Sequence, residues 1–464
     1  MRYISTRGQA PVLSFEDTML TGLARDGGLY VPETVPVLAE AEFAALAGAL
    51  YEEAAFRVMR PFIGDTFTDD EFRACIDAAY ASFDHPARCP LTQIGVNEWV
   101  LELHHGPTLA FKDVALQLIG QMFDRVLARH GRRICIVGAT SGDTGSAAME
   151  AFRGAENVDV FFLHPHNRVS EVQRRQMTTL GAGNLHAIAL DGTFDDCQAR
   201  VKDMFNDHAF RDEIGLAAAN SINWARVLAQ VVYYVTAAVA LGSPARRVSF
   251  TVPTGNFGDI YAGHIARRMG LPVDQMVIAT NENDILHRTL TSGVSENRGV
   301  APTIAPSMDI QISSNFERLL FELYDQDGGA VAQLMDEQKS AGTFRLSQGA
   351  WERLKEGFAS GRADRAETMA TIARVAREGG PVLDPHTAIG VHVARQVARD
   401  PAVPMITLGT AHAAKFPDAV AEACGQRPAL PARMADLYDR DETMTVLAND
   451  LAALQDHIRR ERRA

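Results

Sequence analysis

The sequence predicts an α/β protein. From about residue 99 onward, short apolar runs typical of strands alternate with longer segments of helical spacing. Alternation of this kind predicts parallel strands joined by crossover helices. Three of the strand-like runs end in loops that carry glycine and hydroxyl residues. Because ligands of parallel sheets bind at such strand ends, the same segments predict where a functional site lies.

The first ninety residues differ from the rest in being mainly helical. Residues 42–57 carry alanine and leucine at helical spacing, and residues 69–83 repeat the pattern after Thr68, which is placed to cap that helix. Prolines bound residues 84–90, which we interpret as a linker. We therefore expect residues 1–90 to form an N-terminal helical domain.

Residues 91–425 are expected to form the α/β core. Its strands are predicted at 99–103, 133–137, 158–163, 185–190, 247–252, 275–279 and 405–408. Its helices are predicted at 112–129, 144–152, 172–180, 194–205 and 224–241. A smaller lobe is expected at about 110–215, a charged helical insertion or cover at 333–378, and a helical tail at 426–464, where residues 451–463 form a polar helix or fray.

The composition excludes several classes of protein. Hydrophobic residues make up 47% and charged residues 22%, which is typical of globular proteins and not of disordered ones. The net charge of −13 argues against nucleic acid as a partner. No apolar run is long enough to span a membrane, and the N-terminus lacks a signal core. The 5 cysteines are dispersed, as in reduced proteins, so we expect a cytoplasmic location.

The first strand-end loop reads Ala139-Thr140-Ser141-Gly142-Asp143-Thr144-Gly145. Its backbone amides and the helix that follows suit an anion. Asp143 is unexpected there, because its charge would repel the ligand. We expect it to orient a protonated group or a hydroxyl, or to cap the helix. A capped turn that binds nothing is the alternative, and the loop alone does not decide between them.

The second and third loops follow later strands. The second reads Val252-Pro253-Thr254-Gly255-Asn256-Phe257-Gly258-Asp259 and lacks the GxGxxG pattern of dinucleotide sites. Its glycines suit a close approach of the backbone to one phosphate. The third reads Leu408-Gly409-Thr410-Ala411-His412 and is a weak signal alone. Two anion loops of one type favour a ligand site over two structural turns.

Lysines are scarce, which narrows the choice of an amine nucleophile to five residues. Three of them are interpreted as solvated: Lys202, Lys339 and Lys355. Lys112 instead opens an apolar helix, where the helix dipole and apolar surroundings favour a neutral, nucleophilic amine. A lysine that extends to solvent is the alternative. Lys415 follows Thr410 by about one helical turn and is placed to face the same strand ends.

An amine nucleophile, a phosphate loop and a second anion loop together predict pyridoxal phosphate bound through a lysine. One loop would hold the phosphate of the cofactor, and the other would hold a substrate carboxylate. The prediction therefore joins the lysine to both loops in one site.

Several motifs, spread over nearly the whole chain, indicate which family of pyridoxal phosphate enzymes the sequence resembles. They are Tyr3-Ile4-Ser5-Thr6-Arg7-Gly8, residues 26–32, residues 104–113, the loops 139–145 and 253–259, Ser313-Ser314-Asn315-Phe316-Glu317-Arg318, residues 384–388 and residues 409–412. With these motifs the sequence resembles the threonine synthases of bacteria and fungi, in the tryptophan-synthase-β-like (fold type II) family of pyridoxal phosphate enzymes. The resemblance implies two parallel-sheet lobes around a cofactor cleft, a helical N-terminal domain, and a monomer or homodimer.

The resemblance also implies roles for particular residues. Lys112 would form the Schiff base, and Thr410 would bond the pyridine nitrogen of the cofactor. The residues at its phosphate end would be Gly255, Asn256, Phe257, Gly258 and Asp259. The substrate carboxylate would be held by Thr140, Ser141, Gly142 and Thr144. Asp143 stands where many relatives carry asparagine, in a place that faces the phenolic oxygen of the cofactor.

The implied reaction converts O-phospho-L-homoserine and water into L-threonine and phosphate. Lys112 would then act as both general base and general acid. The substrate phosphate needs cationic or amide donors, for which the candidates are Lys415, Arg318 and Asn315, followed by His104 and His105. Two alternatives stay open: a phospho-amino-acid lyase or hydroxy-amino-acid dehydratase of the same fold, and a nucleotide-binding or non-catalytic protein.

Overall fold

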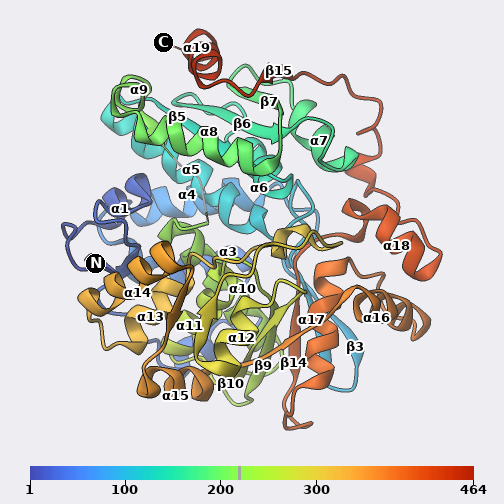
Figure 1. The fold of residues 1–464 in the computed structure, drawn as a ribbon. Helices are drawn as coiled ribbons and strands as arrows, with labels where there is room; N and C mark the ends of the chain where they lie inside the picture. The colour runs from blue at the N-terminus through green and yellow to red at the C-terminus, as the bar shows by residue number, and fades with distance from the viewer. Residues whose placement is uncertain (218–220, 464) are drawn as a thin grey trace. The chain divides into compact units, whose positions relative to one another are not determined.

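The computed structural model describes residues 1–217 and 221–463. These residues divide into two compact units (Figure 1). Unit 1 comprises Met1–Asp70, Asp84–His105 and Ser221–Pro428, and unit 2 comprises Glu71–Phe83, Gly106–Asn220 and Ala429–Ala464. This division differs from the one expected from the sequence, because the N-terminal residues belong to unit 1 and the C-terminal residues to unit 2.

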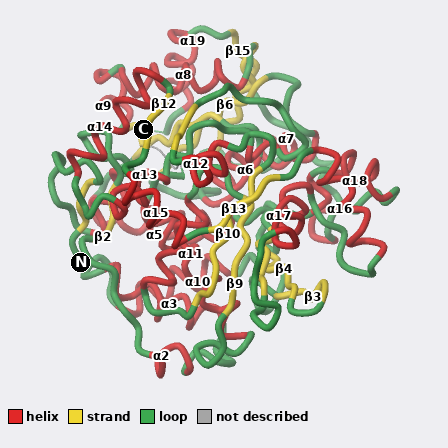
Figure 2. The backbone as a smooth tube through the Cα atoms, turned by 60° about the horizontal axis from the view of Figure 1, so that its bottom comes forward, coloured by secondary structure: helices red, strands yellow, loops and turns green. Residues whose placement is uncertain are grey.

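Unit 1 is built on a mixed sheet with strand order β13-β10-β9-β14-β4-β3, which Figure 2 shows in yellow. The strands are β3 (Leu91–Gly95), β4 (Glu98–Glu102), β9 (Val248–Pro253), β10 (Val273–Thr280), β13 (Ala359–Arg362) and β14 (Met405–Gly409). All neighbours pair in parallel except β3 and β4, which form an antiparallel hairpin. The carboxyl ends of β9 and β14 therefore share one edge, and the second and third predicted loops begin there.

Helices cover both faces of this sheet. Met276 of β10 reaches Gly263 of α11, whereas Val277 packs in one cluster with Ile389 and Val393 of α17. Because successive strand residues point to opposite faces, α11 and α17 lie on opposite sides. The helices of unit 1 are α1 (Phe15–Thr21), α2 (Glu40–Ala44), α3 (Tyr51–Ile63), α10 (Trp224–Ala240), α11 (Gly258–Arg268), α12 (Ile285–Ser292), α13 (Phe316–Leu323), α14 (Gly328–Ala341), α15 (Gln348–Gly357), α16 (Arg365–Arg377), α17 (Pro385–Gln396) and α18 (Pro417–Cys424).

The N-terminal segment is part of unit 1 because polar side chains tie it to α13. Arg7 pairs with Glu317 at 2.9 Å, and Arg318 donates to the carbonyl of Tyr30 at 3.0 Å. Two small antiparallel pairs complete the unit: β1 (Tyr3–Ser5) with β2 (Tyr30–Pro32), and β11 (Val294–Glu296) with β12 (Thr343–Arg345). Short 3₁₀ turns lie at Pro306–Met308 and Ala413–Lys415.

Unit 2 is built on a parallel sheet with strand order β15-β7-β6-β5-β8. Its strands are β5 (Ile134–Ala139), β6 (Val158–Pro165), β7 (Leu185–Asp191), β8 (Leu216–Ala217) and β15 (Thr445–Ala448). Its helices are α4 (Asp69–Tyr80, of which residues 71–80 lie in the unit), α5 (Lys112–His130), α6 (Asp143–Ala151), α7 (Glu171–Thr178), α8 (Phe194–Asn206), α9 (His208–Ile214) and α19 (Leu451–Glu461). One apolar cluster joins α8, α9 and α19 to β5, β6 and β7.

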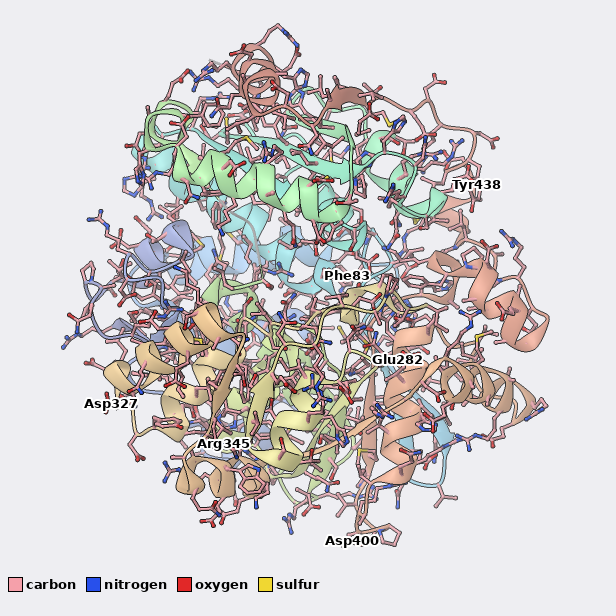
Figure 3. All side chains as sticks on the ribbon, in the orientation of Figure 1. Phe83, Glu282, Asp327, Arg345, Asp400 and Tyr438 are labelled. Atoms are coloured by element: carbon pink, nitrogen blue, oxygen red, sulfur yellow. The ribbon has the colours of Figure 1, made fainter. Side chains whose placement is uncertain are left out.

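The C-terminal segment is an integral part of unit 2. β15 pairs with β7, and Leu454 and Ile458 of α19 are fully buried, so the tail helix is packed along its length. A 3₁₀ turn at Ala432–Met434 starts the segment. Farther along, the guanidinium of Arg175 lies 5.8 Å from the ring centroid of Tyr438, which is labelled in Figure 3.

Some elements differ from those predicted from the local sequence patterns. The single helix predicted at 42–57 is two helices, α2 and α3, because Gly48 adopts a left-handed φ of 76° between them. The charged stretch 333–378 is helical as expected, but it also contains β12, which pairs with β11, and β13, which pairs with β10. None of the described helices is both long and apolar enough to cross a membrane.

Candidate active site

Lys112 is the first residue of α5, and a buried carboxylate fixes the turn before it. Asp113, which is fully buried, accepts from the backbone N–H of Thr108 at 2.8 Å and from its hydroxyl at 2.7 Å. A Cβ on Gly106 would lie 2.4 Å from the Cβ of Asp113, so only glycine fits there. The Lys112 side chain is 12% exposed. The amine is therefore held at a helix start and largely shielded from water.

The loop between β5 and α6 is folded around the hydroxyl of Thr140. Its Oγ1 accepts the N–H groups of Gly142 and Gly145, both at 2.9 Å. A Cβ on Gly145 would lie 2.4 Å from the Cγ2 of Thr140. The first N–H groups of a helix have no partner inside the helix and attract anions. A carboxylate at this loop would bind the amides of the first turn of α6, those of Asp143 and Thr144.

Asp143 lies beside Lys112. Its side chain is 5% exposed, and its Oδ2 is 3.7 Å from the Nζ of Lys112. Its Oδ1 accepts from the Nε2 of Gln173 at 2.8 Å. Asp143 is the first residue of α6, and Gly142 occupies the cap position. Of the two roles expected for Asp143, the geometry matches the orientation of a neighbouring group, because its Oδ2 lies beside the amine of Lys112 and Gly142 takes the cap position.

The glycine loop of unit 1 runs from β9 into the N-terminus of α11. Phe257 adopts a left-handed φ of 63°, which turns the chain into the helix at Gly258. A Cβ on Gly255 would lie 2.7 Å from the carbonyl oxygen of Ser307, and Ser313 donates to the carbonyl of Gly255 at 2.7 Å. The loop is thus fixed by a neighbouring loop, and its helix-start amides suit a phosphate group.

The Asp259 side chain is arranged differently from the expected phosphate ligand. Its Oδ1 accepts from the hydroxyls of Tyr233 and Tyr234, the latter at 2.8 Å. Burial raises the pKa of Asp259 to about 6, although both tyrosine bonds act in the other direction. Because a carboxylate held by two tyrosines repels a phosphate, only the backbone N–H of Asp259 fits that role. The side chain anchors α11 to α10.

Asn315 and Arg318 also differ from the expected phosphate ligands. Asn315 Nδ2 donates to the carbonyls of Asn256 at 3.0 Å and Ser221 at 3.1 Å. Arg318 is fully buried and donates to the carbonyls of Tyr30 and Ile222 and to the side chain of Asn315. All of the Arg318 nitrogens therefore have protein acceptors. The pair positions the glycine loop and the start of α10.

Arg226 is a candidate that the sequence reasoning missed. It lies in the first turn of α10 and is 5% exposed, and burial lowers its pKa to about 10. Within the described part of the chain, its Nε and Nη1 have no hydrogen-bond partner. Asn315 bonds both Ser221 and Asn256, so the start of α10 lies next to the glycine loop. An arginine in the otherwise apolar run 224–241 was the available signal.

Thr410 and Lys415 follow the carboxyl end of β14. Between them, the Nδ1 of His412 accepts the N–H of Ala414 at 3.1 Å and caps the turn that contains Lys415. Lys415 is fully buried. The ring centroid of His104 lies 5.2 Å from that of His412. The structure therefore places these predicted residues along one edge of the sheet of unit 1.

The two histidines after β4 are less suited to bind phosphate. Burial, together with the neighbouring His412, lowers the pKa of His104 to about 4, so its ring is neutral at pH 7. His105 is engaged by Glu102 at 2.8 Å and by Asp84 at 3.0 Å. Neither ring offers a free cation. Lys415 and Arg226 are both buried cations of unit 1.

The residues present fit pyridoxal phosphate. Unit 2 carries the shielded amine of Lys112, and unit 1 carries both a glycine loop with helix-start amides at 254–258 and a neutral hydroxyl after β14 at Thr410. Among the described residues, no group of histidine, cysteine, aspartate and glutamate side chains is arranged to hold a metal ion. The donor set is that of an organic phosphate cofactor with a carbonyl group.

Comparison with known proteins agrees with this donor set. A family model described as pyridoxal-phosphate dependent enzyme matches residues 85–349, and models described as threonine synthase N terminus and threonine synthase, C-terminal match residues 2–80 and 387–458. The chain is 56% identical to threonine synthase of Pseudomonas aeruginosa, over 98% of this chain and 97% of that protein. Pyridoxal phosphate-bound threonine synthase from Brucella melitensis superimposes with a TM-score of 0.98 at 56% identity, with 100% of each chain covered. The yeast enzyme superimposes with a TM-score of 0.94 at 38% identity, covering 99% of this chain and 98% of that one.

Proposed function

The chain belongs to the threonine synthase family of pyridoxal phosphate-dependent enzymes, and on this premise we propose how its residues carry out the reaction. The reaction takes O-phospho-L-homoserine and water to L-threonine and phosphate. The observation that supports our assignment most directly is the shielded amine of Lys112, with Asp143 at 3.7 Å. The lysine opens an apolar helix, and the neighbouring loop presents amides to a carboxylate.

Lys112 is assigned the proton transfers. Pyridoxal phosphate, when bound, supplies an acceptor for the electron pair left on the substrate. The amine of Lys112 takes the proton from the α carbon and then one from the β carbon. Phosphate leaves from the γ carbon, and water adds at the β carbon. Lys112 then returns protons to the substrate, so one residue serves as base and acid.

The two loops are assigned the anionic groups. The amides of residues 255–259 would hold the cofactor phosphate, and Thr410 would donate to or accept from the ring nitrogen. Thr140, Ser141, Gly142 and Thr144 would hold the substrate carboxylate. A loop that uses backbone amides binds an anion without adding a positive charge, which suits a chain with a net charge of −13.

Lys415 and Arg226 are assigned the substrate phosphate. Lys415 is fully buried close to Thr410, and Arg226 is buried at the start of α10 beside the glycine loop. A cation shielded from water binds phosphate more strongly than an exposed one. Arg226 replaces Arg318 and Asn315 in this role, since their donors are engaged by the protein.

We further propose a cytoplasmic location and a monomer or homodimer that acts on a small molecule, without nucleic acid or membrane partners. The cysteines of the described chain are free thiols, as is usual in a reducing compartment. Sedimentation of the purified protein measures its assembly state, and fractionation of the source cells measures its location.

A product assay tests the reaction. The purified protein is incubated with O-phospho-L-homoserine, and phosphate, threonine, 2-oxobutyrate and ammonia are all measured. Threonine and phosphate in equal amounts support the proposal. Phosphate with 2-oxobutyrate and ammonia would instead identify a lyase of the same fold. A colourless protein that releases no phosphate would point to a non-catalytic member.

A further inference from the structure

A chain of hydrogen bonds leads from the start of α7 to Asp143, entirely within unit 2. Ser170 caps α7 by accepting the backbone N–H of Gln173 at 3.4 Å. The same hydroxyl donates its proton to the Oε1 of Gln173 at 2.9 Å. Because Oε1 is the acceptor in that bond, the Nε2 end of the amide points the other way. It donates to the Oδ1 of Asp143 at 2.8 Å.

Packing holds Gln173 in this orientation. Its side chain is buried, and Gly142 adopts a φ of 137° beside it. A Cβ on Gly142 would lie 2.5 Å from the Cδ of Gln173. The amide is therefore confined between Gly142 and the cap of α7. The carboxylate of Asp143 cannot turn away without losing its bond to Gln173.

Two features favour the ionised form of Asp143. It is the first residue of α6, where the helix dipole stabilises a negative charge. It also accepts a hydrogen bond from Gln173, and a donor to a carboxylate stabilises the anion. The remaining oxygen, Oδ2, is 3.7 Å from the Nζ of Lys112. A negative charge at that distance favours the protonated form of the amine.

We propose that Gln173 is a positioning residue for the reacting nitrogen of Lys112. It turns the Oδ2 of Asp143 toward the amine, and it thereby sets how tightly that nitrogen holds a proton. The inference rests on the proposed function, in which Lys112 carries the cofactor and moves protons. It also accounts for a carboxylate in a loop whose other groups suit an anion.

The test is a pH titration of the visible absorbance band of the cofactor in the purified holoenzyme. Gln173→Met keeps the length of the side chain and removes the donor. Since Oδ2 of Asp143 is then no longer held toward the amine, the titration midpoint is expected to fall by about half to one pH unit. Asp143→Asn removes the charge and is expected to lower the midpoint at least as far. In the double variant, Gln173→Met adds no further shift to that of Asp143→Asn.

A matched control separates this effect from loss of stability. Gln455 is also a buried glutamine of unit 2, and its Nε2 donates to Asp207 at 2.9 Å. Gln455→Met therefore removes the same kind of bond elsewhere, and it should lower Tm without moving the midpoint. If Gln173→Met fails to fold or to bind cofactor, Ser170→Ala replaces it in the test. This variant removes the hydrogen bond to the Oε1 of Gln173 and should give a smaller shift of the midpoint in the same direction.

Two results would overturn the inference: an unchanged midpoint in Gln173→Met and Ser170→Ala, or a shift from Gln173→Met that persists in the Asp143→Asn background. The readout is the absorbance of the bound cofactor and not turnover. A wild-type protein that binds pyridoxal phosphate but makes no threonine would contradict the proposed function alone, and the titration would still decide the role of Gln173.

Discussion

Tyr234 donates its hydroxyl to the Oδ1 of Asp259 across 2.8 Å, and Tyr233 donates to the same oxygen. Over the described residues, the other oxygen of this buried carboxylate has no partner. The side chain of Asp259 thus fixes the first turn of α11 to α10. Through this anchor Asp259 supports the glycine loop. Because its carboxyl group is buried, its protonation affects the stability of the folded protein.

Asp259 should make stability depend on pH. Burial raises its pKa to about 6 in the folded protein, from 3.8. The folded state therefore binds the proton more tightly than the unfolded state, and the ionised carboxyl costs stability that is recovered as the pH falls through 6. Relative to Asp259→Asn, we expect the wild type to lose about 1–2 kcal/mol of unfolding free energy between pH 5 and pH 8.

Denaturant unfolding at several pH values measures that difference. Asp418, whose side chain is 88% exposed, provides the control. The difference between the wild type and Asp418→Asn should stay flat across the same range. A flat difference for Asp259→Asn as well would show that Asp259 titrates normally.

Arg226 and Arg318 form a matched pair of buried arginines with opposite expected outcomes. Arg318→Met leaves three protein acceptors without a donor, and we expect it to cost about 3 kcal/mol or more. Arg226→Met removes no donor from the acceptors of the described residues, so it should change Tm little. Its effect should instead be a rise of about tenfold or more in KM for O-phospho-L-homoserine. Steady-state kinetics and thermal melts of the two variants test this, and an unchanged KM in Arg226→Met would remove that residue from the site.

Lys415→Met should impair use of the phosphorylated substrate. Lys415 is fully buried next to the strand end that carries Thr410, so its charge is poorly screened. We expect KM to rise or kcat to fall by about tenfold or more. Lys355→Met, on an exposed part of α15, is the control and should leave both constants unchanged. Equal kinetics in the two variants would contradict a role for Lys415.

Arg463 should contribute strongly to the stability of unit 2. Its Nε lies 2.6 Å from Asp159, whose side chain is 2% exposed, and its Nη2 donates to two backbone carbonyls at 2.8 Å. Without Arg463, the buried carboxylate of Asp159 keeps one ion pair with a described residue, the longer contact to Arg133 at 3.6 Å. Because Arg463 is itself partly exposed, we expect Arg463→Ala to cost about 1–3 kcal/mol. Arg211→Ala, at an exposed pair with Asp212 in the same unit, should cost less than about 0.5 kcal/mol in the same denaturant measurement. Equal costs would argue against the buried pair.

Much of the fold could be predicted because local patterns determine it. The alternation of apolar runs and amphipathic segments located the main parallel strands and the long helices such as α5 and α10. β13 could not be predicted, because Ala359-Ser360-Gly361-Arg362 has no strand-like periodicity and becomes a strand only by pairing with β10. The place of the C-terminal segment likewise depends on the pairing of β15 with β7, far away in sequence.

The candidate site divides in the same way. Lys112 and the glycine loops carry local signals, namely a lysine at a helix start and glycines at strand ends. The engagement of Arg318 could not be predicted, because its acceptor at Tyr30 is 288 residues away. For the same reason the orientation of Asp143 by Gln173 required the fold, although Asp143 itself stood out as a negative charge in an anion loop.

The most direct test of the central claim is the reaction of the wild-type protein with O-phospho-L-homoserine in ¹⁸O-labelled water, with Lys112→Ala as the comparison. Cleavage at the γ carbon and addition of water at the β carbon predict threonine that carries the label in its hydroxyl group, unlabelled phosphate, and neither product from Lys112→Ala. Labelled phosphate together with homoserine, or undiminished threonine formation by Lys112→Ala, would contradict the account.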